Sequence, residues 1–126
     1  MLRCLGAGLL LAGVTGRATA QAPSPRTYVF VKLDEVIPPA DREARYERPL
    51  EAALREAGVG RVLGGVNSST PEGAIEWVGL EVELTDYIRG IPLLRKKLAE
   101  LGAPKGSTLE YRFNGRLVRL PVHDGS

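Results

Sequence analysis

The chain has 126 residues, of which 44% are hydrophobic and 25% are charged. This composition is typical of one globular domain, and it excludes a fibrous or a fully disordered protein. The 17 basic and 15 acidic residues give a formal net charge of +2, so the whole chain is only weakly basic.

The first twenty residues have the pattern of a signal peptide. Arg3 precedes an apolar stretch over 5–14, and small residues at 18–20 offer a cleavage site between Ala20 and Gln21. The apolar stretch is shorter than the roughly 20 residues that a membrane-spanning helix needs. We therefore expect export to the periplasm or the medium, with no membrane span.

Cleavage at this site would change the charge of the protein. It would remove two arginines and no acidic residue, which leaves 15 basic residues against 15 acidic ones. It would also remove Cys4, the only cysteine of the chain. The exported form would then have no thiol and no net charge.

Residues 21–26 are predicted to form a flexible lead-in, 27–122 the folded domain and 123–126 a tail. Apolar and polar residues alternate over 27–34, which predicts a strand. Residues 41–48 are densely charged, and we expect them to be irregular or to form one loose turn. Pro49 suits the first position of a helix. That helix is predicted from apolar residues at helical spacing, which are Leu50, Ala53, Leu54 and Ala57. Gly58 is predicted to end it.

The second half predicts four more strands and a helix, with the last two strands joined in a tight hairpin. A weaker strand over 61–69 and a strong one over 74–85 flank a turn at 70–73. A second helix follows, with Pro92 in its first turn because proline is costly inside a helix. Its stripe is Ile91, Leu94, Leu98 and Leu101. Asn114-Gly115 then predicts a type I′ hairpin between 108–113 and 116–122.

This order of elements predicts an α+β protein. The pattern is that of the ferredoxin-like β-α-β-β-α-β plait, with an antiparallel sheet, two helices on one face and a C-terminal β-hairpin extension. The first and third strands should be central in such a sheet. Their aliphatic rows should face the helices, and these rows are Val29, Val31, Leu33, Val78, Leu80, Val82 and Leu84.

Two stretches, Pro39–Leu50 and Leu98–Pro104, resemble sequences of small bacterial ferredoxin-like proteins of uncharacterised function. The resemblance covers about 27–122 and implies the fold only, because this fold hosts many unrelated functions.

The sheet face opposite the helices, here called the open face, is the first candidate site. Its central rows are predicted to be Tyr28, Phe30, Lys32, Trp77, Glu81 and Glu83. An uncovered face with three aromatic side chains is typical of a protein interface, unless the C-terminal hairpin or the lead-in folds over it. A cross-strand ion pair of Lys32 with Glu81 or Glu83 is expected there. Aromatic sheets also stack RNA bases, but the balanced charge and the two glutamates argue against a nucleic-acid partner.

The second candidate is Gly64-Gly65 with the polar residues at 67–70. Paired glycines in a strand indicate either a bulge at a sheet edge or a close approach by a ligand, such as an anion or a small polar molecule. The stretch lacks the lysine of a phosphate-binding loop. We favour the edge bulge.

The third candidate is the charged segment that follows the first strand. Its acids and one tyrosine could transfer protons or bind a cation, although the interleaved arginines favour ordinary surface ion pairs. The residues of this alternative site are Asp34, Glu35, Asp41, Tyr46 and Glu47.

Other chemistry finds little support in the sequence. His123 stands beside Asp124, but the end of a chain is a poor place to orient a catalytic base. One histidine and one cysteine leave no zinc site of the usual composition, and no cofactor or metal is expected.

The leading hypothesis is a non-enzymatic exported domain that binds itself, as a homodimer, or a protein partner through the open face. The alternatives are a small cofactor-free enzyme of the dimeric α+β barrel type, using Tyr46 and a nearby acid, and an inhibitor or immunity-like module.

Overall fold

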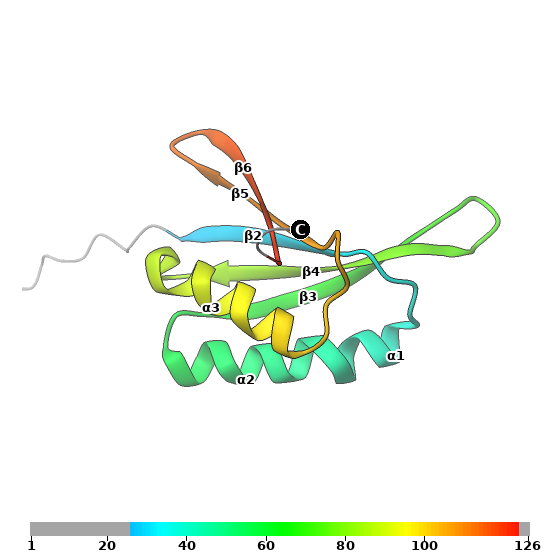
Figure 1. Cartoon of the computed structure of the whole chain (residues 1–126), viewed down its shortest axis with the longest axis horizontal. Helices are drawn as coiled ribbons and strands as arrows, with labels where there is room; N and C mark the ends of the chain where they lie inside the picture. Colours follow the sequence, from blue (N-terminus) through cyan, green and yellow to red (C-terminus); the bar gives the residue numbers. More distant parts are fainter. Residues whose placement is uncertain (1–25, 124–126) are drawn as a thin grey trace, which may run out of the picture.

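The computed structural model describes residues 26–123, which form an α+β domain (Figure 1). The signal peptide predicted at 1–20 and its cleavage site lie outside the described residues, as do 124–126. The elements in chain order are β2 (Thr27–Leu33), α1 (Pro39–Arg42), η3 (Glu43–Glu47), α2 (Arg48–Ala57), β3 (Gly60–Ser69), β4 (Ile75–Leu84), α3 (Tyr87–Glu100), β5 (Thr108–Phe113) and β6 (Arg116–Pro121).

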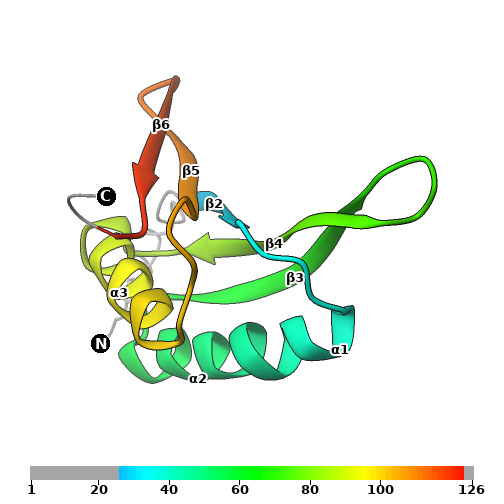
Figure 2. The ribbon, with the colours of Figure 1, turned by 45° about the vertical axis from the view of Figure 1, so that its right-hand side comes forward.

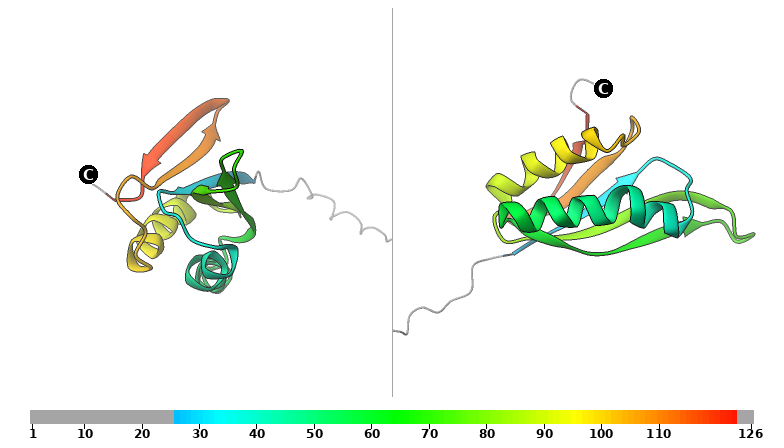
Figure 3. Two further views of the ribbon diagram at one scale, coloured as in Figure 1. Left: turned by 90° about the vertical axis from the view of Figure 1, so that its right-hand side faces the viewer. Right: turned by 90° about the horizontal axis from the view of Figure 1, so that it is seen from below.

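The five strands form one antiparallel sheet in the order β3-β4-β2-β5-β6. The predicted α+β class and antiparallel sheet are therefore confirmed, and the first and third predicted strands, β2 and β4, pair with each other as expected. The helices cover one face of the sheet, while the β5–β6 hairpin leans away from them (Figures 2 and 3).

The core lies between the helices and the predicted aliphatic rows of β2 and β4. Every residue of these two rows is at most 2% exposed. From α2 and α3 the core receives Leu50, Leu54, Leu94 and Leu98, all fully buried. This burial is the main stabilising contribution, because each such side chain contributes about 1.5–3 kcal/mol.

The prediction that 41–48 would be irregular is wrong. The chain is helical without a break from α1 through η3 into α2, and the Arg48 N–H donates to the carbonyl of Glu43, five residues back. Pro49 has no N–H to donate, and its ring would crowd the carbonyl four residues earlier in a regular helix. The wider π turn just before Pro49 allows the helix to continue through it.

The prediction that Pro92 lies in the first turn of the second helix is also wrong, because α3 begins earlier than expected. Asp86 caps the helix, its carboxylate accepting the Arg89 N–H at 3.1 Å. Pro92 therefore stands inside the helix, on its exposed side. The predicted type I′ turn is confirmed, with positive φ angles of 53° at Asn114 and 79° at Gly115.

Candidate functional site

The open face holds a groove of about 590 Å³ that is lined by residues of the sheet and of the leaning hairpin. Tyr28 and Phe30 line its floor, and Leu63 and Leu117 line its two sides from β3 and β6. Tyr28, Leu63 and Leu117 are between 45% and 59% exposed. The hairpin thus forms one wall of the groove and leaves the aromatic floor accessible.

Phe30, Trp77 and Lys32 pack together next to this groove. The Phe30 and Trp77 rings meet edge to face with centroids 5.9 Å apart, and the Lys32 ammonium lies 5.2 Å from the centroid of the Trp77 ring. Gly79 lies opposite Lys32, and a Cβ atom there would overlap the Phe30 ring. Within residues 26–123, no ion pair joins Lys32 to Glu81 or Glu83, so the predicted pair is replaced by a cation–π contact.

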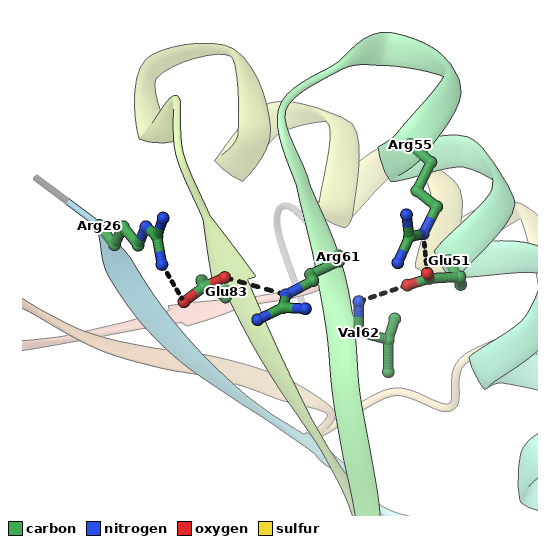
Figure 4. Close-up of polar contacts among 6 residues, drawn as sticks. All are labelled: Arg26, Glu51, Arg55, Arg61, Val62 and Glu83. Carbon is green, nitrogen blue, oxygen red and sulfur yellow. Dashed lines mark hydrogen bonds and ion pairs between the residues drawn. The ribbon is translucent and has the colours of Figure 1, made fainter. Parts of the chain in front are cut away.

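Glu83 lies at the end of the open face and is only 5% exposed. Its carboxylate accepts from Arg61 Nε at 3.0 Å and from Arg26 Nη1 at 3.4 Å (Figure 4). The pKa of Glu83 lies below its ordinary value. Burial alone would raise this pKa, but the hydrogen bonds from Arg61 and Tyr28 and the charges of Arg26 and Arg61 outweigh the effect of burial. Glu81, in contrast, is exposed and stands opposite Phe30.

The residues of the alternative site do not form one site. Tyr46 is fully buried, and its hydroxyl donates to Glu35 Oε2 at 2.5 Å and accepts from Arg45 Nη2 at 3.0 Å. Arg45 also binds Glu35 Oε1 at 2.8 Å. Asp34 lies elsewhere, against Gly106 and Ser107, and Asp41 is exposed in α1.

These contacts make Tyr46 unsuited to proton transfer. Burial, followed by the hydrogen bond and charge of Glu35, raises the pKa of Tyr46 to about 12. The hydroxyl is therefore neutral at physiological pH and shielded from solvent. This arrangement favours a structural role over the enzymatic alternative.

Glu47 joins the charged segment to the paired glycines of β3. It accepts from Arg42 Nε at 2.5 Å, and Arg42 also donates to Asn67 Oδ1, while Asn67 Nδ2 donates to the carbonyl of Ile37 at 2.9 Å. Arg42 is only 7% exposed. The second and third candidate sites thus contribute to one buried polar contact. β3 is an edge strand with a bulge between Val62 and Gly64, next to the paired glycines where a bulge was favoured from the sequence.

His123 also has a structural contact, since its Nε2 lies 2.6 Å from the carbonyl oxygen of Ala103. Within residues 26–123, no three histidine, cysteine or acidic side chains gather as a metal site would require. In the same part of the chain, no helix is both long and apolar enough to cross a membrane. Comparisons with protein-family models, curated proteins and solved structures gave no match.

Several residues that shape the open face have no signal in the local sequence pattern. Leu63 and Leu117 become groove walls only because of the bulge in β3 and the lean of the hairpin. Arg26 was assigned to the lead-in, yet it binds Glu83. Arg61 lies opposite Glu83 in the register of β3 with β4. Their contact could have been predicted from the sequence by pairing these two strands across the turn that joins them.

Proposed function

We propose that this chain is an exported, non-enzymatic binding domain that self-associates through its open face. The observation that carries the proposal is the groove with an accessible apolar floor and walls, lined by Tyr28, Phe30, Leu63 and Leu117. Monomeric proteins seldom leave a continuous apolar surface of this kind uncovered. Export rests on the signal-peptide pattern of residues 1–20.

The proposed fold is a ferredoxin-like plait extended by one strand. Two features support it: β4 and β2 pair between β3 and β5, and a helical segment connects β2 to β3 and another connects β4 to β5. β6 is then the added strand, and it turns the open side of the plait into a groove.

A second copy of the chain is the occupant that the charges favour. Glu81 stands on one side of β2, and Arg112 lies on the other side, beside the neutralised pair of Glu110 and Arg119. A two-fold axis along β2 would bring the Glu81 side of one copy over the Arg112 side of the other. The same face therefore offers both signs of charge, as a symmetric interface requires.

Light scattering on the full chain at high micromolar concentration tests this proposal. We expect a dimer for the wild type and a monomer for Leu117→Glu, because the new carboxylate would be buried against the apolar groove. Ile88→Glu is the matched control: Ile88 is 71% exposed on α3 and outside the groove, so this variant should remain a dimer.

Two outcomes would refute self-association through the open face. One is a monomeric wild type across the whole concentration range, which would leave a different protein as the occupant of the groove. The other is a dimer that Leu117→Glu weakens no more than Ile88→Glu does. Circular dichroism on each variant establishes that the fold is retained.

A further inference from the structure

Three arginines from different elements line one cavity at the end of the sheet, next to the groove. Arg26 precedes β2, Arg55 lies in the last turn of α2, and Arg61 is in β3; we call these three the arginine cluster. The cavity measures about 500 Å³ and is also lined by Gly58, Gly60, Glu83 and Thr85. Each arginine side chain is more than half exposed.

Carboxylates hold these guanidinium groups in place from behind. Glu83, whose side chain is 7% exposed, binds Arg26 and Arg61, and Glu51 binds Arg55 (Figure 4). Glu51 is itself fixed, because its Oε1 accepts the Val62 N–H at 2.6 Å. The arginines are therefore oriented before any ligand arrives, which lowers the entropic cost of binding.

The hydrogen bonds within the described residues leave donors of the cluster for a ligand. Arg55 and Arg61 each use Nε toward their carboxylate, so the two terminal nitrogens of each remain as a fork. A planar fork of this kind matches the two oxygens of a carboxylate. The pKa values of Glu51 and Glu83 both lie below the ordinary value for a glutamate. Burial would raise these pKa values, but the hydrogen bonds from the arginines outweigh it. Both carboxylates therefore stay ionised, and keep the arginines oriented, into mildly acidic solution.

The charge of the cluster selects the ligand. Three guanidinium groups and two carboxylates leave one net positive charge, which a single carboxylate balances and a phosphate dianion exceeds. We propose that the arginine cluster is a binding site for an organic carboxylate, either a small free acid or the carboxyl terminus of a peptide. The cavity shares Arg26 with the groove, but Arg55 and Arg61, whose terminal nitrogens form the two forks, do not line the groove. The proposal therefore does not rest on the proposed self-association.

Nuclear magnetic resonance titration of the full chain tests this site. The probes are acetate, a blocked tripeptide with a free carboxyl terminus, and the same tripeptide amidated. We expect saturable shifts at Arg55, Arg61 and Glu83 with the two carboxylates and none with the amide. Tighter binding of the peptide than of acetate would identify a peptide terminus as the natural ligand, and equal binding a small free acid.

Arg55→Gln is the diagnostic variant because Arg55 does not touch Glu83 and so leaves the buried ion pairs intact. It should weaken carboxylate binding by about tenfold or more, as expected for one lost charge-assisted contact. Arg116→Gln, which makes the same charge change beside the hairpin turn, should bind like the wild type. Equal affinity in Arg55→Gln, shifts matched by chloride at the same ionic strength, or tighter binding of inorganic phosphate would each overturn the proposal.

Discussion

Tyr46 is the clearest case of a single residue whose environment decides its chemistry. The buried hydroxyl stands between Glu35 and Arg45, so it completes a polar contact inside the helical layer. Arg42, one turn earlier, does the same with Glu47. Both residues are buried at the four-residue spacing that Leu50 and Leu54 continue in α2. The buried stripe of the continuous helical segment therefore begins with two polar side chains, one in α1 and one in η3.

Replacing Tyr46 with phenylalanine should lower the free energy of unfolding by about 1.5–3 kcal/mol, because Glu35 loses a hydrogen bond to its charged oxygen. The folded pKa of about 12 lies above the ordinary value of 10.0. The stability due to Tyr46 is therefore complete below pH 10 and is lost as the pH rises toward 12. Urea denaturation at several pH values, with tyrosinate absorbance, measures both effects; an unchanged alkaline loss in the variant would contradict this origin.

The segment around Arg42 and Tyr46 shows which contacts a local sequence pattern does not predict. Alternation and helical spacing predicted the buried rows of β2 and β4, because burial there follows from side-chain periodicity alone. Arg42 and Tyr46 were read as surface residues, since nothing in the sequence shows that Asn67 and Glu35 lie near enough to satisfy them. Long-range polar partners are set by tertiary packing, which a local pattern does not contain.

At the scale of elements, the contact of the helical layer with β3 depends on glycine at Gly65, which directly follows the bulge. A Cβ atom on Gly65 would overlap Arg42 Nε and Glu47 Oε2, whereas one on Gly64 would meet nothing within 4 Å. The two adjacent glycines therefore have different roles. Gly65 allows the helical layer to approach the edge strand, and Gly64 stands at the register shift itself.

These neighbours offer a matched pair of variants. Gly65→Ala should destabilise the domain by about 1–3 kcal/mol, because the buried ion pair must move. Gly64→Ala should be neutral or stabilising by up to about 1 kcal/mol, since alanine restricts the unfolded chain. Chemical denaturation of both proteins compares them directly, and equal destabilisation would show that the close approach at Gly65 carries no cost.

The sequence predicted best those helix ends and turns that are marked by residues with a strong local preference, such as glycine. Gly58 ends α2 with a φ of 70°, and Asn114-Gly115 makes the predicted turn. The start of α3 differs from the prediction because proline was expected in the first turn, whereas the helix begins after the Asp86 cap and contains Pro92 in its interior. The groove was missed for a different reason: it depends on how far the hairpin leans, and that angle is a property of sheet twist.

At the scale of the whole molecule, the charge depends on where the chain begins. The full sequence carries +2, and both excess positive charges lie in the predicted signal peptide. If this segment is cleaved, the protein is electrically balanced, and specific local charges such as the arginine cluster matter more than the overall field.

Mass spectrometry of the intact protein recovered from the exported fraction checks this prediction. We expect a chain that begins at Gln21, without Arg3, Arg17 and Cys4. The matched control is the same protein carrying Ala18→Arg and Ala20→Arg, which should be retained uncut because a cleavage site needs small residues. A wild-type chain that keeps its first twenty residues would remove the case for export.

The position of β2 in the sheet also sets an order of assembly. β3 with β4 and β5 with β6 are neighbours in sequence and joined by short turns, whereas β2 pairs only with β4 and β5, which lie far along the chain. Closing such long loops is the slow part of folding. The strand made first is therefore the last to find both of its partners, because β5 lies near the end of the chain.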